Sequence, residues 1–188
     1  MQLGLPGFDA GGPAGFVYQP DLLAPAEEDA LLARVRPLEL GEFVMHGVAA
    51  RRQVRMYGWD YATGRRVLTP GEPIPAFLLP LRERCAALSG LPPDRLEMAL
   101  VIRYPPGAGI GWHRDAPQFG RVVGVSLGAP CRMRLRRGPG RPSTEVVLAP
   151  RSGYALAGAA RWAWQHHIPP VKAERYSVTF RSLKRDRS

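Results

Sequence analysis

The sequence of 188 residues has few lysines, cysteines and histidines. Lys172 and Lys184 are the only lysines among 26 basic residues, so arginine carries nearly all of the net charge of +10. The two cysteines, Cys85 and Cys131, are too few for a disulfide framework, and we expect reduced thiols in the core. No uncharged apolar stretch is long enough to span a bilayer, and the first twenty residues lack the Lys or Arg of a secretory signal. These shortages favour a soluble, cytoplasmic monomer that does not enter a membrane.

The rest of the amino-acid composition is typical of a globular protein with a hydrophobic core. Hydrophobic residues make up 45% of the sequence and charged residues 22%, which excludes a disordered basic tail. This length predicts one domain over residues 1–188. The 21 glycines and 20 prolines are typical of turns that separate many short strands.

The positive charge is unevenly distributed along the chain. Residues 1–50 carry two arginines and seven acidic residues, so the whole basic excess lies after residue 50. Because the arginine guanidinium matches phosphate and carboxylate geometry, this excess suits a polyanionic partner. A solubilising surface of the same composition explains the charge equally well.

The pattern of apolar residues changes along the chain. A helix is expected from Pro25, with Glu27 and Glu28 in its first turn, and a second over 74–88 that Pro80 shortens or kinks. From residue 96 onward short apolar or alternating runs alternate with Gly and Pro clusters. The runs are Leu96–Tyr104, Val122–Leu127, Met133–Leu135, Val146–Leu148, Tyr154–Leu156 and Tyr176–Leu183. This order predicts a mainly β (α+β) fold, a sandwich or jelly roll with N-terminal helices packed outside.

A candidate metal site is centred on His113 and Asp115. On a strand, residues two apart point to the same face, so this pair plus one distant histidine makes a facial triad for Fe(II). A simple hydrogen-bonded His–Asp pair is the alternative. His166 and His167 point to opposite faces if extended, so only one reaches the metal, and spacing does not say which. His46 has no partner pattern and is expected to be an ordinary residue.

The segment 175–181 alternates between polar and apolar residues. One face carries Arg175, Ser177, Thr179 and Arg181, and the other carries Tyr176, Val178 and Phe180. Two arginines on an inward face need a counter-charge, and they suit the two ends of a short dicarboxylate. The alternative is a half-exposed strand with a solvated polar face.

Four motifs occur in a recognisable order: Arg-Tyr-x-x-Gly at 103–107, His-x-Asp at 113–115, Trp-x-His-x-Ile at 164–168 and Arg-x-x-x-Thr-Phe-Arg at 175–181. Over residues 15–183 the chain resembles the AlkB family of Fe(II)- and 2-oxoglutarate-dependent dioxygenases. The resemblance implies a double-stranded β-helix over 96–183, preceded by an extension over 1–95 with helices and a nucleotide-recognition lid at about 46–68.

The resemblance also implies a role for each motif residue. The metal ligands, which are also the catalytic residues, would be His113, Asp115 and His166. The residues that bind the cosubstrate 2-oxoglutarate would be Tyr104, Arg175, Ser177 and Arg181, with Arg175 on the distal carboxylate. The third reactant is O2. Two positions depart from the family pattern: Ile102 replaces a common asparagine, and Ala116-Pro117-Gln118 replaces an acidic pair found in DNA-repair members.

The lid contains arginines interleaved with aromatic residues, which suits a nucleotide because rings stack on bases while arginines hold phosphates. The resemblance makes Trp59 and Tyr61 substrate contacts, with Arg51 and Arg55 beside them. An amphipathic hairpin with core aromatics is the alternative. A later cluster could hold a second stretch of backbone or form a solvated edge; it consists of Arg132, Arg134, Arg136, Arg137 and Arg141.

Together these features predict an oxidative dealkylase. It would couple conversion of 2-oxoglutarate to succinate and CO2 with hydroxylation of an N-alkyl or etheno-type adduct, which then leaves as an aldehyde. Its partner would be single-stranded or flipped-base DNA, or RNA. Two alternatives remain: the same chemistry on a protein side chain or small molecule, and a non-catalytic nucleic-acid-binding module.

Overall fold

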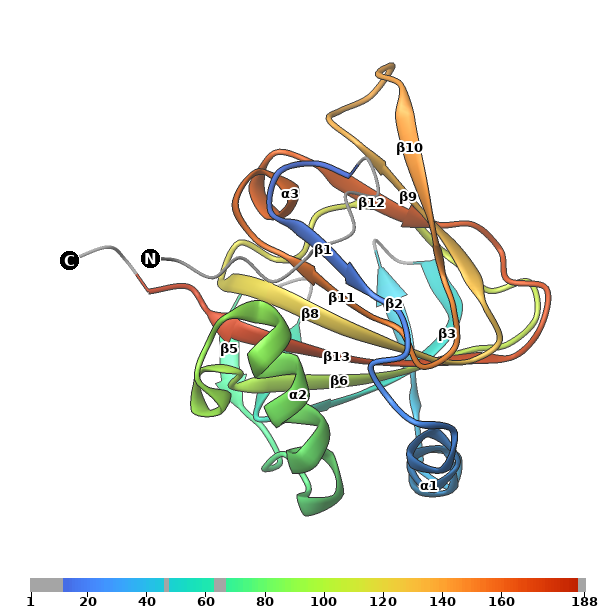
Figure 1. The fold of residues 1–188 in the computed structure, drawn as a ribbon, viewed down its shortest axis with the longest axis vertical. Coiled ribbons are helices and arrows are strands. Elements are labelled where there is room, and N and C mark those ends of the chain that lie inside the picture. The colour runs from blue at the N-terminus through green and yellow to red at the C-terminus, as the bar shows by residue number, and fades with distance from the viewer. Residues whose placement is uncertain (1–11, 46–47, 63–66, 186–188) are drawn as a thin grey trace.

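The computed structural model describes residues 12–45, 48–62 and 67–185 of the chain (Figure 1). His46 and two parts of the predicted lid, 46–47 and 63–66, lie outside the described residues. Among those described, no helix is long and apolar enough to cross a membrane.

Two antiparallel sheets form the body of the protein. The larger sheet has the order β1 (Phe16–Gln19), β11 (Gly153–Leu156), β8 (Phe119–Gly128), β13 (Arg175–Leu183), β6 (Met98–Tyr104), β3 (Val48–Tyr57) and β2 (Gly41–Met45). The smaller sheet has the order β10 (Ser143–Leu148), β9 (Cys131–Arg136), β12 (Gln165–Ile168) and β7 (Ile110–His113). A separate ribbon pairs β4 (Trp59–Ala62) with β5 (Val67–Pro70). This is the predicted mainly β jelly roll.

Two of the three described helices, α1 (Pro25–Val35) and α2 (Leu79–Ser89), cover one face of the larger sheet, and α3 (Gly158–Trp162) lies apart from them near β12 (Figure 1). Single 3₁₀ turns lie at Ala76–Leu78 and Pro93–Arg95. The helix expected from Pro25 is confirmed, and the Glu27 carboxylate accepts a hydrogen bond from the Ala24 amide at 2.8 Å. The helix expected over 74–88 is partly wrong, because the α-helix begins only at Leu79. Pro80 lies in its first turn, where a missing N–H costs no hydrogen bond, and the α-helix is shortened at its start, as expected of Pro80.

The core has two layers, one on each face of the larger sheet. Residues Tyr176, Val178 and Phe180 of β13 pack with the apolar faces of α1 and α2. The second layer lies between the two sheets and includes Met98 and Leu100 of β6. The alternation predicted for 175–181 is therefore confirmed.

The polar face of β13 points between the sheets and is shielded from solvent. Arg175 is 0% exposed, and Ser177 and Thr179 are each 3% exposed. The alternative of a half-exposed strand with a solvated face is therefore wrong. A polar face enclosed in this way needs partners for its hydrogen-bonding groups, which directs attention to the space between the sheets.

Strands occur earlier in the chain than the sequence pattern indicated. The six apolar runs after residue 96 correspond to β6, β8, β9, β10, β11 and β13. The first three strands of the chain also join the larger sheet: β1 pairs with β11, and β3 pairs with both β2 and β6. The N-terminal segment thus contributes strands to this sheet as well as helices.

Candidate active site

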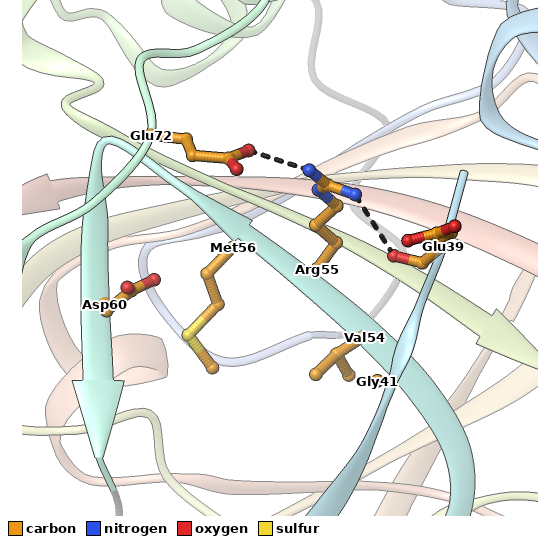
Figure 2. A pocket seen from close by; sticks show the side chains of 7 residues that line it. All are labelled: Glu39, Gly41, Val54, Arg55, Met56, Asp60 and Glu72. Atoms are coloured by element: carbon orange, nitrogen blue, oxygen red, sulfur yellow. Dashed lines mark hydrogen bonds and ion pairs between the residues drawn. The ribbon is translucent and has the colours of Figure 1, made fainter.

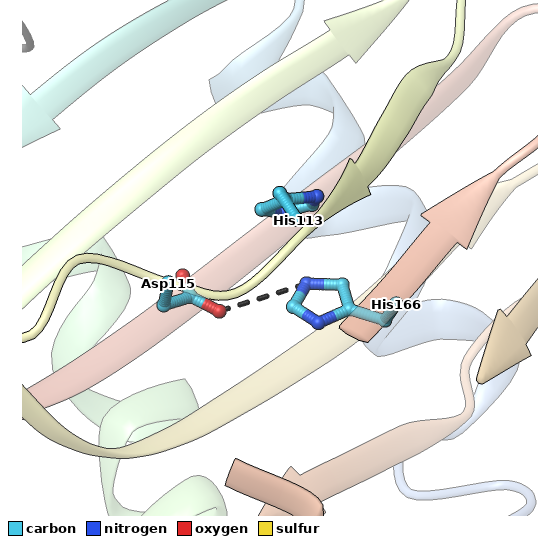
Figure 3. Close-up of side chains that lie close together, drawn as sticks. All are labelled: His113, Asp115 and His166. Atoms are coloured by element: carbon cyan, nitrogen blue, oxygen red, sulfur yellow. Dashed lines mark ion pairs between the residues drawn. The ribbon is translucent and has the colours of Figure 1, made fainter. Parts of the chain in front are cut away.

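The smaller sheet brings three potential metal ligands together (Figure 3). His113 ends β7 and pairs directly with His166 on β12, and their rings lie 4.1 Å apart between centroids. Asp115 follows two residues after His113, and its Oδ2 lies 3.6 Å from His166 Nε2. One ligand atom from each residue lies within 4.8 Å of the others. This is a compact His–Asp–His cluster suited to a facial metal triad.

The adjacent His167 points away from this cluster. Its ring packs on the outer side of the sheet against Trp112, with centroids 5.0 Å apart. Strand alternation explains the division, because neighbouring residues on β12 face opposite sides. The geometry therefore selects His166 over His167, a choice that spacing alone had left open.

The Asp115 carboxylate is held in the charged form. Burial alone would raise the pKa of Asp115, but Arg181, followed by the two histidines, outweighs burial and holds the pKa below its usual value. Arg181 donates to Oδ1 from Nε at 2.8 Å and from Nη2 at 2.6 Å. The other oxygen, Oδ2, is buried and has no hydrogen-bond partner in the described part of the chain. One carboxylate oxygen is thus fixed while the other faces the histidines.

Both histidines are kept neutral. Burial lowers the pKa of His113, and burial together with the neighbouring His113 lowers that of His166 to about 3. Neutral imidazoles have lone pairs available for a metal ion. His113 Nδ1 lies 2.8 Å from the Gly111 carbonyl oxygen, which can only accept a hydrogen bond. Nδ1 is therefore the protonated nitrogen, and Nε2 carries the lone pair.

A second buried polar group lies deeper between the sheets. Arg175 is fully buried; its Nε donates to Ser126 Oγ at 3.0 Å, and its guanidinium lies 4.9 Å from the centre of the Tyr104 ring. Its Nη1 has no hydrogen-bond partner among the residues described. A buried cation with an unused donor is a binding point for an anion. Ser177, two residues along the same face of β13, pairs with Ser126 and Ile102 on the neighbouring strands.

Sequence reasoning missed Arg161, which fastens the segment that follows Asp115. Arg161 is 3% exposed and lies in α3. It donates to the carbonyl oxygens of Ala116 at 2.8 Å, Phe119 at 2.7 Å and Gly120 at 2.8 Å. An arginine five residues before a candidate ligand carries no sequence signal of this role, because its partners are backbone carbonyls.

The residues predicted to contact the substrate differ in their burial and surroundings. Trp59 and Tyr61 pack against the core between the sheets, and the Tyr61 ring meets Phe119 edge-on at 6.2 Å. Arg51 is exposed. Arg52, which follows Arg51 on β3, is 5% exposed, interacts electrostatically with Tyr104 and His113, and lies beside the cluster.

Arg55 does not point toward the cluster. Its guanidinium forms an ion pair with Glu72 at 2.8 Å and lines a cavity of about 300 Å³ together with Glu39 and Asp60 (Figure 2). The alternation of β3 explains this, since Val54 and Met56 pack against the core between the sheets while Arg55 faces the other way. The structure therefore does not bring Arg55 to the His–Asp–His cluster.

The arginine cluster of residues 132–141 lies on the β9–β10 hairpin, which projects at one end of the molecule (Figure 1). Arg134 forms an ion pair with Glu145 at 3.0 Å, and Arg136 lies 4.1 Å from the centre of the Trp112 ring. β9 is the direct neighbour of β12, which carries His166. The hairpin thus adds positive charge to the outer face of the sheet that holds the histidines.

Comparison with known proteins places the chain in a family. Residues 15–181 match the model of the 2OG-Fe(II) oxygenase superfamily. The chain belongs to this superfamily. Fe(II), 2-oxoglutarate and O2 are therefore its cofactor and co-reactants, and the protein is a dioxygenase.

Similar proteins confirm the resemblance to AlkB. The chain is 30% identical over 189 residues to the Alkylated DNA repair protein ALKBH8 homolog of Arabidopsis thaliana, covering 86% of this chain and 52% of that protein. It is 27% identical to the Alpha-ketoglutarate-dependent dioxygenase AlkB of Escherichia coli (strain K12), covering 60% and 57%. The chain thus spans about half the length of these curated relatives. The solved structure of OsALKBH1 superposes with a TM-score of 0.72 at 17% identity, covering 89% of this chain and 96% of that one, and shares the fold.

The side chains present fit the metal and cosubstrate of this family. The unpartnered Asp115 Oδ2 and the two neutral histidines make a donor set for Fe(II). The unused Arg175 Nη1 fits one carboxylate of 2-oxoglutarate.

Proposed function

We propose that this dioxygenase removes N-alkyl or etheno-type adducts from the bases of DNA or RNA. The observation that carries the proposal is the position of the His–Asp–His cluster on a sheet whose neighbouring hairpin carries the arginines of the 132–141 cluster. A sheet with a buried oxidising site on its inner face and arginines on its outer face suits a polyanion that inserts one residue. The names of the relatives, a DNA-repair protein and AlkB, support the same substrate class.

In this proposal, different residues bind the metal and orient its ligands. His113, Asp115 and His166 would hold Fe(II), while Arg181 fixes Asp115 through Oδ1 and leaves Oδ2 on the side of the histidines as a ligand atom. When bound, iron with 2-oxoglutarate and O2 supplies the oxidation of the alkyl carbon, with succinate and CO2 as by-products. The hydroxylated carbon then leaves as an aldehyde and restores the base.

The cosubstrate would lie along the polar face of β13. Arg175 would bind the distal carboxylate through its unused Nη1, with Tyr104 and Ser177 as further hydrogen-bonding groups. Burial of these side chains excludes water from the charged end of the cosubstrate, which strengthens each hydrogen bond.

The base would enter past Trp59 and Tyr61. Aromatic rings stack on any base, and exposed Arg51 is available for a phosphate at the rim. A base within a duplex cannot reach a buried metal, so the target must be flipped out or already single-stranded. Arg55 does not enter this proposal, since its guanidinium is paired with Glu72.

The test is to incubate the protein, Fe(II), 2-oxoglutarate and O2 with a panel of methylated and etheno-modified DNA and RNA oligonucleotides. Mass spectrometry should show restored bases, and formaldehyde should accumulate in step with succinate when the lesion is a methyl group. The Asp115→Ala variant, which lacks the carboxylate ligand, is the inactive control.

Two outcomes would redirect the proposal. Succinate formation that stops in Asp115→Ala, without repair of any oligonucleotide, would indicate the same oxygenase chemistry on a protein side chain or small molecule. Oligonucleotide binding with no consumption of 2-oxoglutarate under any condition would indicate a non-catalytic binding module.

A further inference from the structure

A buried tyrosine lies across the larger sheet beside the candidate cosubstrate site. Tyr154 of β11 pairs with Gly124 of β8, which in turn pairs with Thr179 of β13. A Cβ built on Gly124 would lie 2.5 Å from the Tyr154 hydroxyl oxygen and closer still to two ring carbons. The phenol ring therefore lies directly over Gly124, and its hydroxyl extends from β11 toward β13. Only a glycine leaves space for the ring in this position.

The hydroxyl of Tyr154 lies among the charged groups of the site. The side chain is 7% exposed. Its phenol interacts electrostatically with Arg175, Asp115, Tyr104 and Arg181, and the interaction with Arg175 is the largest of the four. Burial raises the pKa of Tyr154, so the phenol stays protonated and remains a donor at neutral pH.

Besides Tyr104, which is already assigned to the cosubstrate, the strands next to β13 supply few donors at this point. On β6, Ile102 stands opposite Ser177 and offers no hydrogen-bonding side chain to the polar face. On β8, the Ser126 hydroxyl accepts a hydrogen bond from Arg175 Nε, and its own O–H is one further donor beside this nitrogen. A carboxylate at Arg175 Nη1 has several lone pairs to satisfy, and one guanidinium nitrogen satisfies only part of them.

We propose that the Tyr154 hydroxyl donates a hydrogen bond to the carboxylate of 2-oxoglutarate that Arg175 binds, and that Gly124 creates the space that lets it do so. Tyr154 is then a specificity-determining residue for a 2-oxo acid that carries a second carboxylate. This inference rests on the assignment of 2-oxoglutarate and of Arg175, and it is independent of the nucleic-acid substrate.

The test compares two ligands in the Tyr154→Phe variant, which removes one oxygen and keeps the ring. Isothermal titration calorimetry with Mn(II) in place of Fe(II) measures the dissociation constants of 2-oxoglutarate and of pyruvate. Pyruvate has the same 2-oxo acid group and lacks the distal carboxylate. We expect Tyr154→Phe to weaken 2-oxoglutarate binding by about 10-fold to 100-fold, as for a lost hydrogen bond to a charged group, and to leave pyruvate binding unchanged.

The control is Tyr176→Phe, because Tyr176 is similarly buried, at 4% exposed, but faces the helices on the opposite side of the larger sheet. It should bind both ligands as the wild type does. Unchanged 2-oxoglutarate affinity in Tyr154→Phe would overturn the proposal, and so would an equal loss for both ligands, which would indicate a purely structural role. If Tyr154→Phe does not fold, as judged by circular dichroism, Tyr154→Met removes the same hydroxyl and is held to the same two criteria.

Discussion

Replacing Arg161 by methionine tests how the segment after Asp115 is held in place. Methionine keeps an apolar stem of similar length and removes the guanidinium. Three carbonyl oxygens, those of Ala116, Phe119 and Gly120, then lose their donor. Trp162 also loses a cation that lies 4.3 Å from the centre of its ring. We therefore expect the variant to be destabilised and its metal site to be loosened together.

The magnitude follows from two opposing effects. Each hydrogen bond from a charged group contributes about 1.5 kcal/mol at the low end, so three contribute about 4–5 kcal/mol. Against this, burial of the cation is itself costly, and burial lowers the pKa of Arg161 accordingly. The difference predicts a loss of about 2–4 kcal/mol in the free energy of unfolding, or roughly 4–16 °C in Tm for a chain of this length.

Urea unfolding followed by circular dichroism measures the stability, and calorimetric titration with Mn(II) measures the metal site. The matched control is Arg185→Met, since Arg185 forms one ion pair with Glu97 and its side chain is 60% exposed. The control should change stability by less than about 1 kcal/mol and leave Mn(II) binding intact. A loss below about 1 kcal/mol in Arg161→Met would refute the reasoning, because it would mean that the three carbonyls find other donors, such as water, at little cost.

Three further predictions concern the same site and its surface. Gly124→Ala should cost about 1–3 kcal/mol of stability by overpacking against Tyr154 and should weaken 2-oxoglutarate binding, whereas Gly138→Ala, where an added Cβ meets nothing within 4 Å, should do neither. Arg181→Met should destabilise the metal-free protein by about 3–5 kcal/mol, because Asp115 keeps a buried charge without its cation, and saturating Mn(II) should recover more stability in the variant than in the wild type. Fluorescence anisotropy titrations measure the affinity for a single-stranded oligonucleotide at several salt concentrations. Arg55→Gln should leave this affinity unchanged, because Arg55 is paired with Glu72. The double variant Arg137→Gln and Arg141→Gln should lower the affinity and reduce the slope of its salt dependence by about 2. Equal salt slopes in these last two variants would contradict the assignment of the hairpin.

The sequence predicted the fold class and the C-terminal strands because their signals are local. Alternation at 175–181 and the Gly and Pro clusters between short runs need no tertiary information. The strands before residue 70 could not be predicted in the same way. β3 contains Arg51, Arg52 and Arg55, and its strand conformation depends on pairing with β6, which lies more than forty residues further along the chain. Such non-local pairing overrides weak local propensity.

For the candidate site, the sequence predicted which residues meet but not how they are supported. His113, Asp115 and His166 were found because their spacing matches a known order of motifs, and strand pairing then brings them together. Arg161 and Tyr154 were missed. One binds backbone carbonyls and the other crosses a glycine, and neither arrangement leaves a pattern in the residue types themselves.

The scarcity of lysine has a structural explanation in the interior of the protein. Arg161 binds three carbonyl oxygens, Arg181 binds Asp115 through two nitrogens, and Arg175 is buried with one donor unused. Lysine cannot replace these residues, because its ammonium group is a strongly hydrated point charge without a planar fork. In the proposed assignment, part of the +10 charge therefore organises the candidate iron and cosubstrate sites rather than a partner surface. Several surface arginines, including Arg84, Arg103 and Arg151, are paired with acids, and on the β9–β10 hairpin Arg132 and Arg134 are paired with Glu145. Arg137 and Arg141 of the hairpin form no ion pair within the described part of the chain, so they are the stronger candidates for contacts with a polyanion.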